Sequence, residues 1–310
     1  MDVRFGVHAG LQHTSIAELR ELWHRIEELG FDWISIWDHF YAADASGDPH
    51  CLEAVTSHTA LAASTSRVTC GWLVYSAGYR HPAVLANAMA TLEQVANGRV
   101  VLGLGGGWLQ GEYDAYGLHF GTAGERLRML AEYIQCVRGL LTQPRTTFDG
   151  EFFHLRDAQC EPKPVQPRLP IWVGGGGEKV TLRIAAEHAD GWNVPFIGPE
   201  LFAQKNQVLT QWCEKEHRTP GDVTRTVNLG LAIGRNEAEA QRKRDGLKEQ
   251  FGAASSFLEP GMLIGTPQQV IDRIGTYVQG GAEWIIVALR APFDLEGLQV
   301  FIDTVMPAFR

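Results

Sequence analysis

Four consecutive glycines, near the middle of the chain, are the residues whose pattern is most informative about chemistry. They follow a short apolar segment and precede a segment, beginning at Lys179, that is patterned as a helix. In that position free backbone N–H groups and the helix dipole make a site for an anion, and glycine lets the backbone approach a phosphate closely. The run therefore predicts a phosphate grip on a cofactor, with Gly174, Gly175, Gly176 and Gly177 as binding residues. A flexible connector is the plainer alternative.

A second bare stretch, Gly105, Gly106 and Gly107, follows another apolar segment. A flat ring could lie against backbone that carries no Cβ atoms, although the same glycines could simply close a tight turn. A dinucleotide fingerprint is excluded, because Gly103-Leu104-Gly105-Gly106-Gly107-Trp108 lacks the last glycine of that motif. The chain also has no Gly-Lys-Ser/Thr of a P-loop.

Asp38 and His39 form the only ionisable pair at the end of a predicted strand in the first half of the chain. Because histidine titrates near pH ~6.5, His39 could take or give a proton at neutral pH. The plainer alternative is a histidine that only fixes the geometry of a loop. Tyr41, Tyr75, Trp108 and Phe196 could form an apolar roof over a bound ring, although each alone is typical of ordinary packing.

Other chemistries lack their residues. Glycosidases need two facing carboxylates, and metal-dependent hydrolysis needs a cluster of His and Asp; neither pattern occurs at a predicted strand end. The 11 histidines are dispersed, so no metal site is predicted.

Eight short apolar segments, alternating with eight amphipathic helices, must position these residues. The predicted strands are Arg4–Ala9, Trp33–Trp37, Val68–Tyr75, Val100–Leu104, Pro170–Val173, Asp190–Asn193, Thr224–Ile233 and Glu283–Val287. The predicted helices are Ser15–Leu29, Leu52–Ser64, Pro82–Ala96, Glu125–Leu141, Lys179–Glu187, Pro199–His217, Pro267–Gln279 and Leu295–Phe309. Near-continuous apolar strands between such helices indicate a parallel sheet, and eight units favour an α/β fold of the (β/α)₈ TIM-barrel type, whose chemistry lies at the carboxyl ends of its strands.

We expect one domain over residues 1–310 with two insertions. The first, at about 145–160, contains the hairpin signal Phe148-Asp149-Gly150-Glu151. The second, at about 235–265, is charged and weakly patterned and is interpreted as an excursion near the barrel mouth.

The net charge of −9 argues against nucleic acid and anionic membranes as partners, and no apolar stretch is long enough to span a membrane. Five scattered cysteines and an N-terminus without signal-peptide layout predict a cytoplasmic protein with reduced thiols. The helices at 52–63 and 82–96 carry more small and apolar residues than one buried face needs, which predicts a homodimer.

Taken together, these residues resemble the bacterial luciferase-like superfamily and, within it, the coenzyme F420-dependent oxidoreductases. The stretches that carry the resemblance are Glu28-Leu29-Gly30-Phe31-Asp32, Trp37-Asp38-His39-Phe40, Tyr79-Arg80-His81-Pro82-Ala83, Asn97-Gly98-Arg99, Gly103 to Trp108, Pro162-Lys163-Pro164-Val165-Gln166, the four-glycine run, and Ala189-Asp190-Gly191-Trp192-Asn193. They extend over nearly the whole chain.

The resemblance implies a deazaflavin, or alternatively FMN, across the barrel mouth with its phosphate on Gly175-Gly176-Gly177. It also implies a bulge in the third strand with a non-prolyl cis peptide at Trp72-Leu73 that presses on the ring. His39 matches the histidine that acts on the substrate alcohol as a base, or in reverse as an acid. The resemblance favours F420, which moves only hydrides. FMN would instead allow a monooxygenase that needs a flavin reductase.

Two departures bear on the substrate. Members that act on sugar phosphates have a Glu where this chain has Trp108, and a Lys just after the sixth strand, where this chain reads Val194-Pro195-Phe196-Ile197-Gly198. We therefore expect an apolar, uncharged pocket and a small apolar or uncharged organic substrate. Arg80 and Lys179 are candidates to hold the acidic tail of F420, with plain surface placement as the alternative. A non-catalytic flavin-binding barrel and a cofactor-free hydrolase or lyase stay open.

Overall fold

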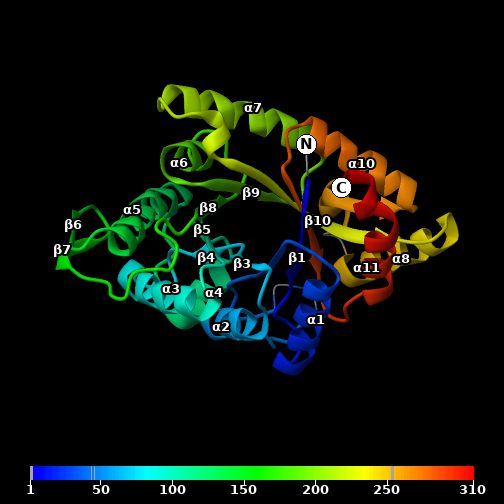
Figure 1. The fold of residues 1–310 in the computed structure, drawn as a ribbon, viewed down its shortest axis with the longest axis horizontal. Helices are drawn as coiled ribbons and strands as arrows, with labels where there is room; N and C mark the ends of the chain where they lie inside the picture. The colour runs from blue at the N-terminus through cyan, green and yellow to red at the C-terminus, as the bar shows by residue number, and fades with distance from the viewer. Residues whose placement is uncertain (1–2, 43, 45, 253–254) are drawn as a thin grey trace.

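Eight parallel strands close into a ring in the computed structural model of the chain, which describes residues 3–42, 44, 46–252 and 255–310 (Figure 1). In ring order they are β1 (Arg4–Ala9), β2 (Trp33–Ile36), β3 (Thr69–Trp72), β5 (Val100–Gly105), β8 (Ile171–Gly174), β9 (Gly191–Pro195), β10 (Thr224–Ile233) and β12 (Trp284–Leu289). The ring closes because β12 pairs with β1 in parallel along its full length. The predicted (β/α)₈ barrel is therefore confirmed.

Helices cover the outside of the ring (Figure 1). They are α1 (Ile16–Glu28), α2 (Ala54–Ser64), α3 (Pro82–Ala96), α5 (Ala123–Thr142), α6 (Thr181–His188), α7 (Pro199–Lys215), α10 (Pro267–Gln279) and α11 (Leu295–Val300). A capping box of Ser15 and Glu18 begins α1. The single helix expected at 295–309 is wrong beyond Val300, where a π-helical turn and a 3₁₀ turn follow. Pro307 lies in that last turn and cannot continue an α-helical hydrogen-bond ladder.

Both insertions contain regular structure, and they lie at opposite ends of the long axis in Figure 1. The first is the expected antiparallel hairpin, β6 (Thr146–Asp149) and β7 (His154–Ala158). The second was expected to be weakly patterned, but it forms α8 (Glu237–Phe251), α9 (Ser255–Leu258) and β11 (Met262–Gly265), and β11 pairs with the far end of β10. A helix charged along its length has no apolar stripe to reveal it, which is why α8 escaped prediction.

The amino end of the barrel interior is filled by tryptophans. The rings of Trp33 and Trp172 stack with centroids 4.5 Å apart, and Trp284 packs edge-on against Trp33 at 5.6 Å. Glycine on a neighbouring strand makes this possible, because a Cβ atom on Gly71 would lie 1.8 Å from the Trp33 ring. This tryptophan plug leaves the carboxyl end of the barrel as the end that can hold a site.

Candidate active site

Asp38 follows β2 and is buried at the barrel mouth, where it anchors β4 (Tyr75–Ser76) and the segment after it. Its Oδ2 atom accepts hydrogen bonds from the backbone N–H of Ser76 at 3.0 Å and from Arg80 at 2.7 Å. Burial raises the pKa of Asp38, and the Arg80 guanidinium opposes that rise. Because Arg80 also donates to Glu53 at 3.0 Å, two carboxylates already engage it, which argues against the suggested role in holding an acidic cofactor tail. The catalytic role of Asp38 stays a prediction, since these contacts are those of an anchor.

His39, the next residue, is held by a carboxylate that sequence reasoning missed. Its Nδ1 atom lies 2.9 Å from Oε2 of Glu112, which belongs to the first turn of α4 (Gln110–Tyr116). The His39 side chain is 14% exposed and that of Glu112 only 1%. The histidine is therefore reachable from the mouth, while its partner is shielded from water.

Glu112 is a buried carboxylate with four donors. Besides His39, Oε2 accepts from the Tyr79 hydroxyl at 2.5 Å, and Oε1 accepts from the backbone N–H groups of Phe40 at 2.5 Å and Tyr41 at 2.9 Å. Burial alone would raise the pKa of Glu112, but the hydrogen bonds from His39 and Tyr79 outweigh it, and the net pKa is lowered. Glu112 is consequently ionised at neutral pH.

Aromatic rings form the wall beside His39. The ring of Trp108 lies edge-on to His39 with centroids 5.7 Å apart, and Trp108 remains 66% exposed. Phe40 stacks on Tyr116 at 4.4 Å, and the Tyr41 ring lies 5.7 Å from the same tyrosine. The structure thus brings Tyr41 and Trp108, two predicted pocket residues, to the side of the mouth where His39 lies.

Phe196, the third predicted pocket residue, lies across the mouth from this wall. It follows β9, which stands opposite β2 in the eight-stranded ring. Its φ of 50° is left-handed, and its backbone packs on Gly261 so closely that a Cβ atom there would lie 2.1 Å from the Phe196 carbonyl carbon. One bound molecule would have to span the mouth to touch all three aromatic residues.

The strand between β2 and β5 is interrupted by a bulge at the mouth. β3 ends at Trp72 and β4 resumes the pairing with β5, and the peptide bond Leu73–Val74 between them is cis. The resemblance had placed this bond one residue earlier, at Trp72-Leu73, which is wrong by one position. Leu73 packs with the side chains that fill the barrel interior.

Trp72 does not belong to the mouth. Its ring is fully buried, stacks on Tyr75 with centroids 4.2 Å apart and lies 4.8 Å from His58 of α2. The side chain is therefore packed among residues outside the barrel interior. Contact between Trp72 and a cofactor at the mouth, as expected from the sequence, does not fit this placement.

Val74, in the bulge, is a mouth residue that sequence reasoning missed. A Cβ atom on Gly105 would lie 2.5 Å from Val74 Cγ2, and one on Gly174 would lie 2.6 Å from Val74 Cγ1. These two glycines thus make room for Val74 and do not simply present bare backbone to a ligand. The surface that covers them is the valine side chain.

The rest of the four-glycine run forms a loop that side-chain hydrogen bonds to its carbonyl groups hold in place. Trp192 donates to the carbonyl of Gly175 at 2.7 Å, and Lys205 of α7 donates to that of Gly176 at 2.7 Å. Gly175 has a φ of 124°, which favours glycine. Within the described part of the chain, the backbone N–H groups of Gly176 and Gly177 make no hydrogen bond, and no side chain caps α6. The loop therefore retains donors for an anion.

In the other glycine run, Gly106 and Gly107 have different surroundings. Gly107 has a φ of 76°, and a Cβ atom there would lie 2.0 Å from the Tyr113 hydroxyl, so this glycine closes a tight turn. Gly106 has room for a Cβ, with Arg126 O and Leu127 Cδ2 each 3.6 Å away. Of the run 105–107, only Gly106 is neither covered by Val74 nor required by the turn.

A histidine and an arginine lie close to this site. His8, near the end of β1, is buried and lies 2.8 Å from the Ser35 hydroxyl. Burial, together with the charges of Arg290 and His39, lowers the pKa of His8 to about 3. Arg290, directly after β12, lies over the Trp37 ring at 5.0 Å from its centroid. The surroundings of His39 are therefore not wholly uncharged, contrary to the expectation for the pocket.

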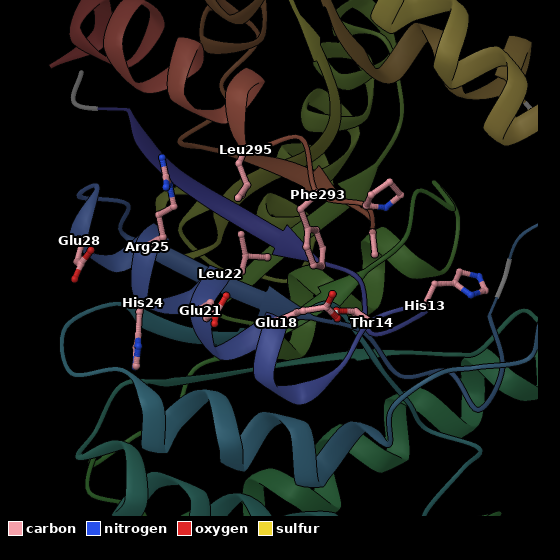
Figure 2. Close-up of a pocket in the computed structure, with 12 residues that line it drawn as sticks. His13, Thr14, Glu18, Glu21, Leu22, His24, Arg25, Glu28, Phe293 and Leu295 are labelled. Atoms are coloured by element: carbon pink, nitrogen blue, oxygen red, sulfur yellow. The ribbon is translucent and has the colours of Figure 1, made fainter.

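A separate groove of about 730 Å³ lies beside this mouth, between α1 and the segment 291–295 (Figure 2). Leu22, Phe293 and Leu295 contribute apolar surface, and Glu18, Glu21 and Glu28 contribute acidic side chains. No predicted site residue lines it. Among the described residues, no group of three His, Cys, Asp or Glu side chains could hold a metal, and no helix is long and apolar enough to cross a membrane.

Comparison with known proteins places the chain among flavin-type and deazaflavin enzymes. The family described as luciferase-like monooxygenase matches residues 3–261. The F420-dependent glucose-6-phosphate dehydrogenase of Kineococcus radiotolerans is 33% identical over 77% of this chain and 70% of its own length, and that of Intrasporangium calvum is 32% identical over 99% of both.

Solved structures share the fold at lower identity. The coenzyme F420-dependent tetrahydromethanopterin reductase from Methanopyrus kandleri superposes with a TM-score of 0.85 at 19% identity, covering 100% of both chains. An F420-dependent secondary alcohol dehydrogenase, solved with an F420-acetone adduct, superposes with a TM-score of 0.87 at 20% identity, again over 100% of both chains. The resemblance stated from the sequence is thereby confirmed, and the chain belongs to the luciferase-like monooxygenase family.

Proposed function

We propose that this protein is an oxidoreductase that transfers a hydride between F420 and a small, apolar or uncharged organic substrate, with His39 as the group that takes or gives the proton. The observation that carries the proposal is the placement of His39. It is a partly exposed histidine, gripped by a buried carboxylate, at the barrel mouth that also holds the glycine loop. The relatives named as F420-dependent dehydrogenases support the choice of cofactor.

The residues at the mouth fit such a cofactor. The free N–H groups of Gly176 and Gly177, in the loop that precedes α6, suit a phosphate group. Leu73 and Val74 supply apolar surface that would hold a flat ring. When bound, F420 supplies hydride transfer and no oxygen chemistry.

His39 supplies the proton transfer. While the carbinol carbon of an alcohol is oxidised, the His39 ring takes the hydroxyl proton, and in the reverse direction it returns that proton to the carbonyl oxygen. His8 does not compete for this role, because burial lowers its pKa to about 3, which makes it a weak proton acceptor, and its ring contacts Ser35. Trp108, edge-on to His39, covers the reacting region with an apolar face.

The mouth favours an apolar or uncharged substrate over a sugar phosphate. Arg80 is engaged by Asp38 and Glu53, and Lys205 by Gly176 and Glu178. Trp108 stands exposed beside His39. Arg290 is half-buried and keeps its charge, but its guanidinium lies over the Trp37 ring, 5.0 Å from the centroid.

Three further features belong to the same proposal. The protein acts as a homodimer through α2 and α3, where Val84 and Val95 of α3 are 62% and 42% exposed. Its five cysteines are free thiols, as in a cytoplasmic protein. An FMN-dependent monooxygenase supplied by a flavin reductase is the second candidate, because the family description names that chemistry.

Titration of the purified apo-protein with F420 and with FMN, followed by fluorescence at fixed ionic strength, tests the proposal. We expect F420 to bind at micromolar concentration or tighter and FMN at least ~10-fold more weakly. Turnover is then screened with secondary alcohols, enones and glucose 6-phosphate. His39→Gln should keep cofactor affinity and lose turnover by about 10²-fold or more.

Each other outcome has a definite meaning. If the protein prefers FMN and consumes oxygen once a reductase is added, it is a monooxygenase and the proposed hydride transfer with F420 is wrong. Binding without any turnover indicates a non-catalytic flavin-binding protein. If neither cofactor binds, the cofactor proposal fails.

A further inference from the structure

The two carboxylate oxygens of Glu112 have different kinds of partner. Oε1 accepts only from backbone, the N–H groups of Phe40 and Tyr41. Oε2 accepts only from side chains, with His39 Nδ1 at 2.9 Å and the Tyr79 hydroxyl at 2.5 Å. The contacts of Oε1 hold the loop after β2 in place. The contacts of Oε2 are not needed for that anchoring, so they require a separate explanation.

The contact with His39 determines where the histidine holds its hydrogen. An ionised carboxylate has no hydrogen to donate, so the hydrogen in the Oε2···Nδ1 contact must belong to Nδ1. A neutral imidazole carries one N–H, so Nε2 is then left with its lone pair. Within the described residues Nε2 makes no hydrogen bond.

We propose that Glu112 is a positioning residue that fixes the Nδ1–H tautomer of His39 and so makes Nε2 the proton acceptor of the site. The reaction that this tautomer serves rests on the proposed function. The tautomer itself is a property of the chain and can be measured without cofactor or substrate.

Replacing Glu112 by glutamine gives a specific structural expectation. Glutamine has one carbonyl oxygen and one NH₂ group, and the backbone N–H groups of Phe40 and Tyr41 can only donate. The amide oxygen must therefore face these two groups, and the NH₂ group must face His39 and Tyr79. His39 Nδ1 then has to accept, which moves its hydrogen to Nε2.

The test is a long-range ¹H–¹⁵N spectrum of the full-length protein labelled with ¹⁵N at the histidine rings, recorded at a pH of about 8.5, where histidine is normally neutral. His39→Gln identifies the His39 signals. In the unsubstituted protein we expect a protonated Nδ1 and a bare Nε2, and in Glu112→Gln the reverse. The first measurement needs no variant, so it stands even if Glu112→Gln does not fold.

Two control variants separate positioning from folding. Tyr79→Phe removes one donor to Oε2 and should leave the His39 tautomer unchanged. Glu27→Gln changes another carboxylate that grips backbone, at Ser66, Arg67 and Val68, and should change neither tautomer nor turnover. In alcohol oxidation Glu112→Gln should lower kcat by about 10³-fold or more, with KM changed less than about threefold, as expected when a catalytic histidine is held in the wrong tautomer.

A hydrogen on Nε2, or an even mixture of tautomers, in the unsubstituted protein overturns the proposal, as does an unchanged spectrum in a folded Glu112→Gln protein. These results are distinguishable from failure of the proposed function. If the tautomer responds as expected but the protein neither binds F420 nor oxidises alcohols, the positioning role stands and the assigned reaction falls.

Discussion

The Cγ1 atom of Val74 lies 2.6 Å from the place that a Cβ atom on Gly174 would occupy, so the side chain of one residue fills the space left by the other. Gly105 stands in the same relation to Val74 Cγ2, at 2.5 Å. Three residues from three different segments are thus fitted to one another at the barrel mouth. The glycines are required by the valine, whatever else they contact.

Replacing Gly105 or Gly174 by alanine should therefore lower the free energy of unfolding only while Val74 is present. Neither glycine has a positive φ, so the cost comes from overlap with the valine and is expected to be about 1–3 kcal/mol. In a Val74→Ala background the same substitutions should cost at least ~1 kcal/mol less. Urea unfolding of the single and double variants measures this coupling.

Gly275 of α10 is the matched control for these substitutions. No atom lies within 4 Å of a Cβ placed there, so Gly275→Ala should stabilise the protein by about 0.5–1 kcal/mol. Equal costs for Gly174→Ala with and without Val74 would show that the valine is not the obstacle.

Asp38→Asn should destabilise the fold strongly, because it leaves the Arg80 guanidinium beside a neutral amide in a mostly buried site. The side chains of Asp38 and Arg80 are 1% and 16% exposed, and breaking a buried pair typically costs about 3–5 kcal/mol, which the remaining pair of Arg80 with Glu53 reduces. Thermal and urea unfolding would measure it. Glu151→Gln breaks the surface pair with Arg128 and should leave the free energy of unfolding almost unchanged, because both side chains are solvated and their attraction is screened. Similar small effects in both variants would mean that the buried pair is not an anchor.

Stability should fall as the pH drops from 6.5 to 5, partly because of His8. The folded protein does not protonate this ring until a pKa of about 3, whereas the unfolded chain does so near its ordinary value of 6.5. The unfolded state thus binds more protons across this window, and the free energy of unfolding decreases by up to ~1.4 kcal/mol per pH unit per such group.

His8→Gln removes this titration, so its stability should depend less steeply on pH between 6.5 and 5. Urea unfolding at three pH values in this window provides the comparison. His50→Gln, at an exposed position, should keep the slope of the unsubstituted protein. Parallel curves for all three proteins would contradict the assignment to His8.

Trp108→Ala should affect catalysis far more than stability. An indole that is 66% exposed contributes little to folding, so the free energy of unfolding should change by less than about 0.5 kcal/mol. If Trp108 covers the substrate beside His39, kcat/KM for an apolar alcohol should fall by about 10-fold or more, mostly through KM. Trp108→Phe should recover much of the loss. An unchanged KM in Trp108→Ala would remove this residue from the pocket.

Local signals in the sequence predicted the barrel well. The helix Pro82–Ala96 was predicted with its true bounds, because Pro82 fits the first turn and Asn97, just past its end, accepts left-handed backbone. The strand Thr224–Ile233 was likewise correct at both ends. In each case the informative signals are local. They are the periodicity of the apolar residues and the residues at or next to the ends of the element.

The site was only partly predictable, because its decisive contacts join distant parts of the chain. His39 was identified from its type and its position after a strand, whereas Glu112, 73 residues later, lies in a short segment with Gly111 and Asp114 that does not look helical. Val74 was missed for a similar reason. Its partners Gly105 and Gly174 are identified as important by the absence of side chains, and the sequence does not say what occupies the space.

The tryptophan plug of Trp33, Trp172 and Trp284 bears on how ligands reach the interior of the barrel. It fills the amino end of the barrel, so we expect ligands to enter and leave through the mouth. Whatever binds deepest has to arrive first and depart last, and the molecule above it blocks its escape. For the proposed reaction we therefore expect ordered kinetics, in which the ligand that lies deeper in the barrel binds first and is released last.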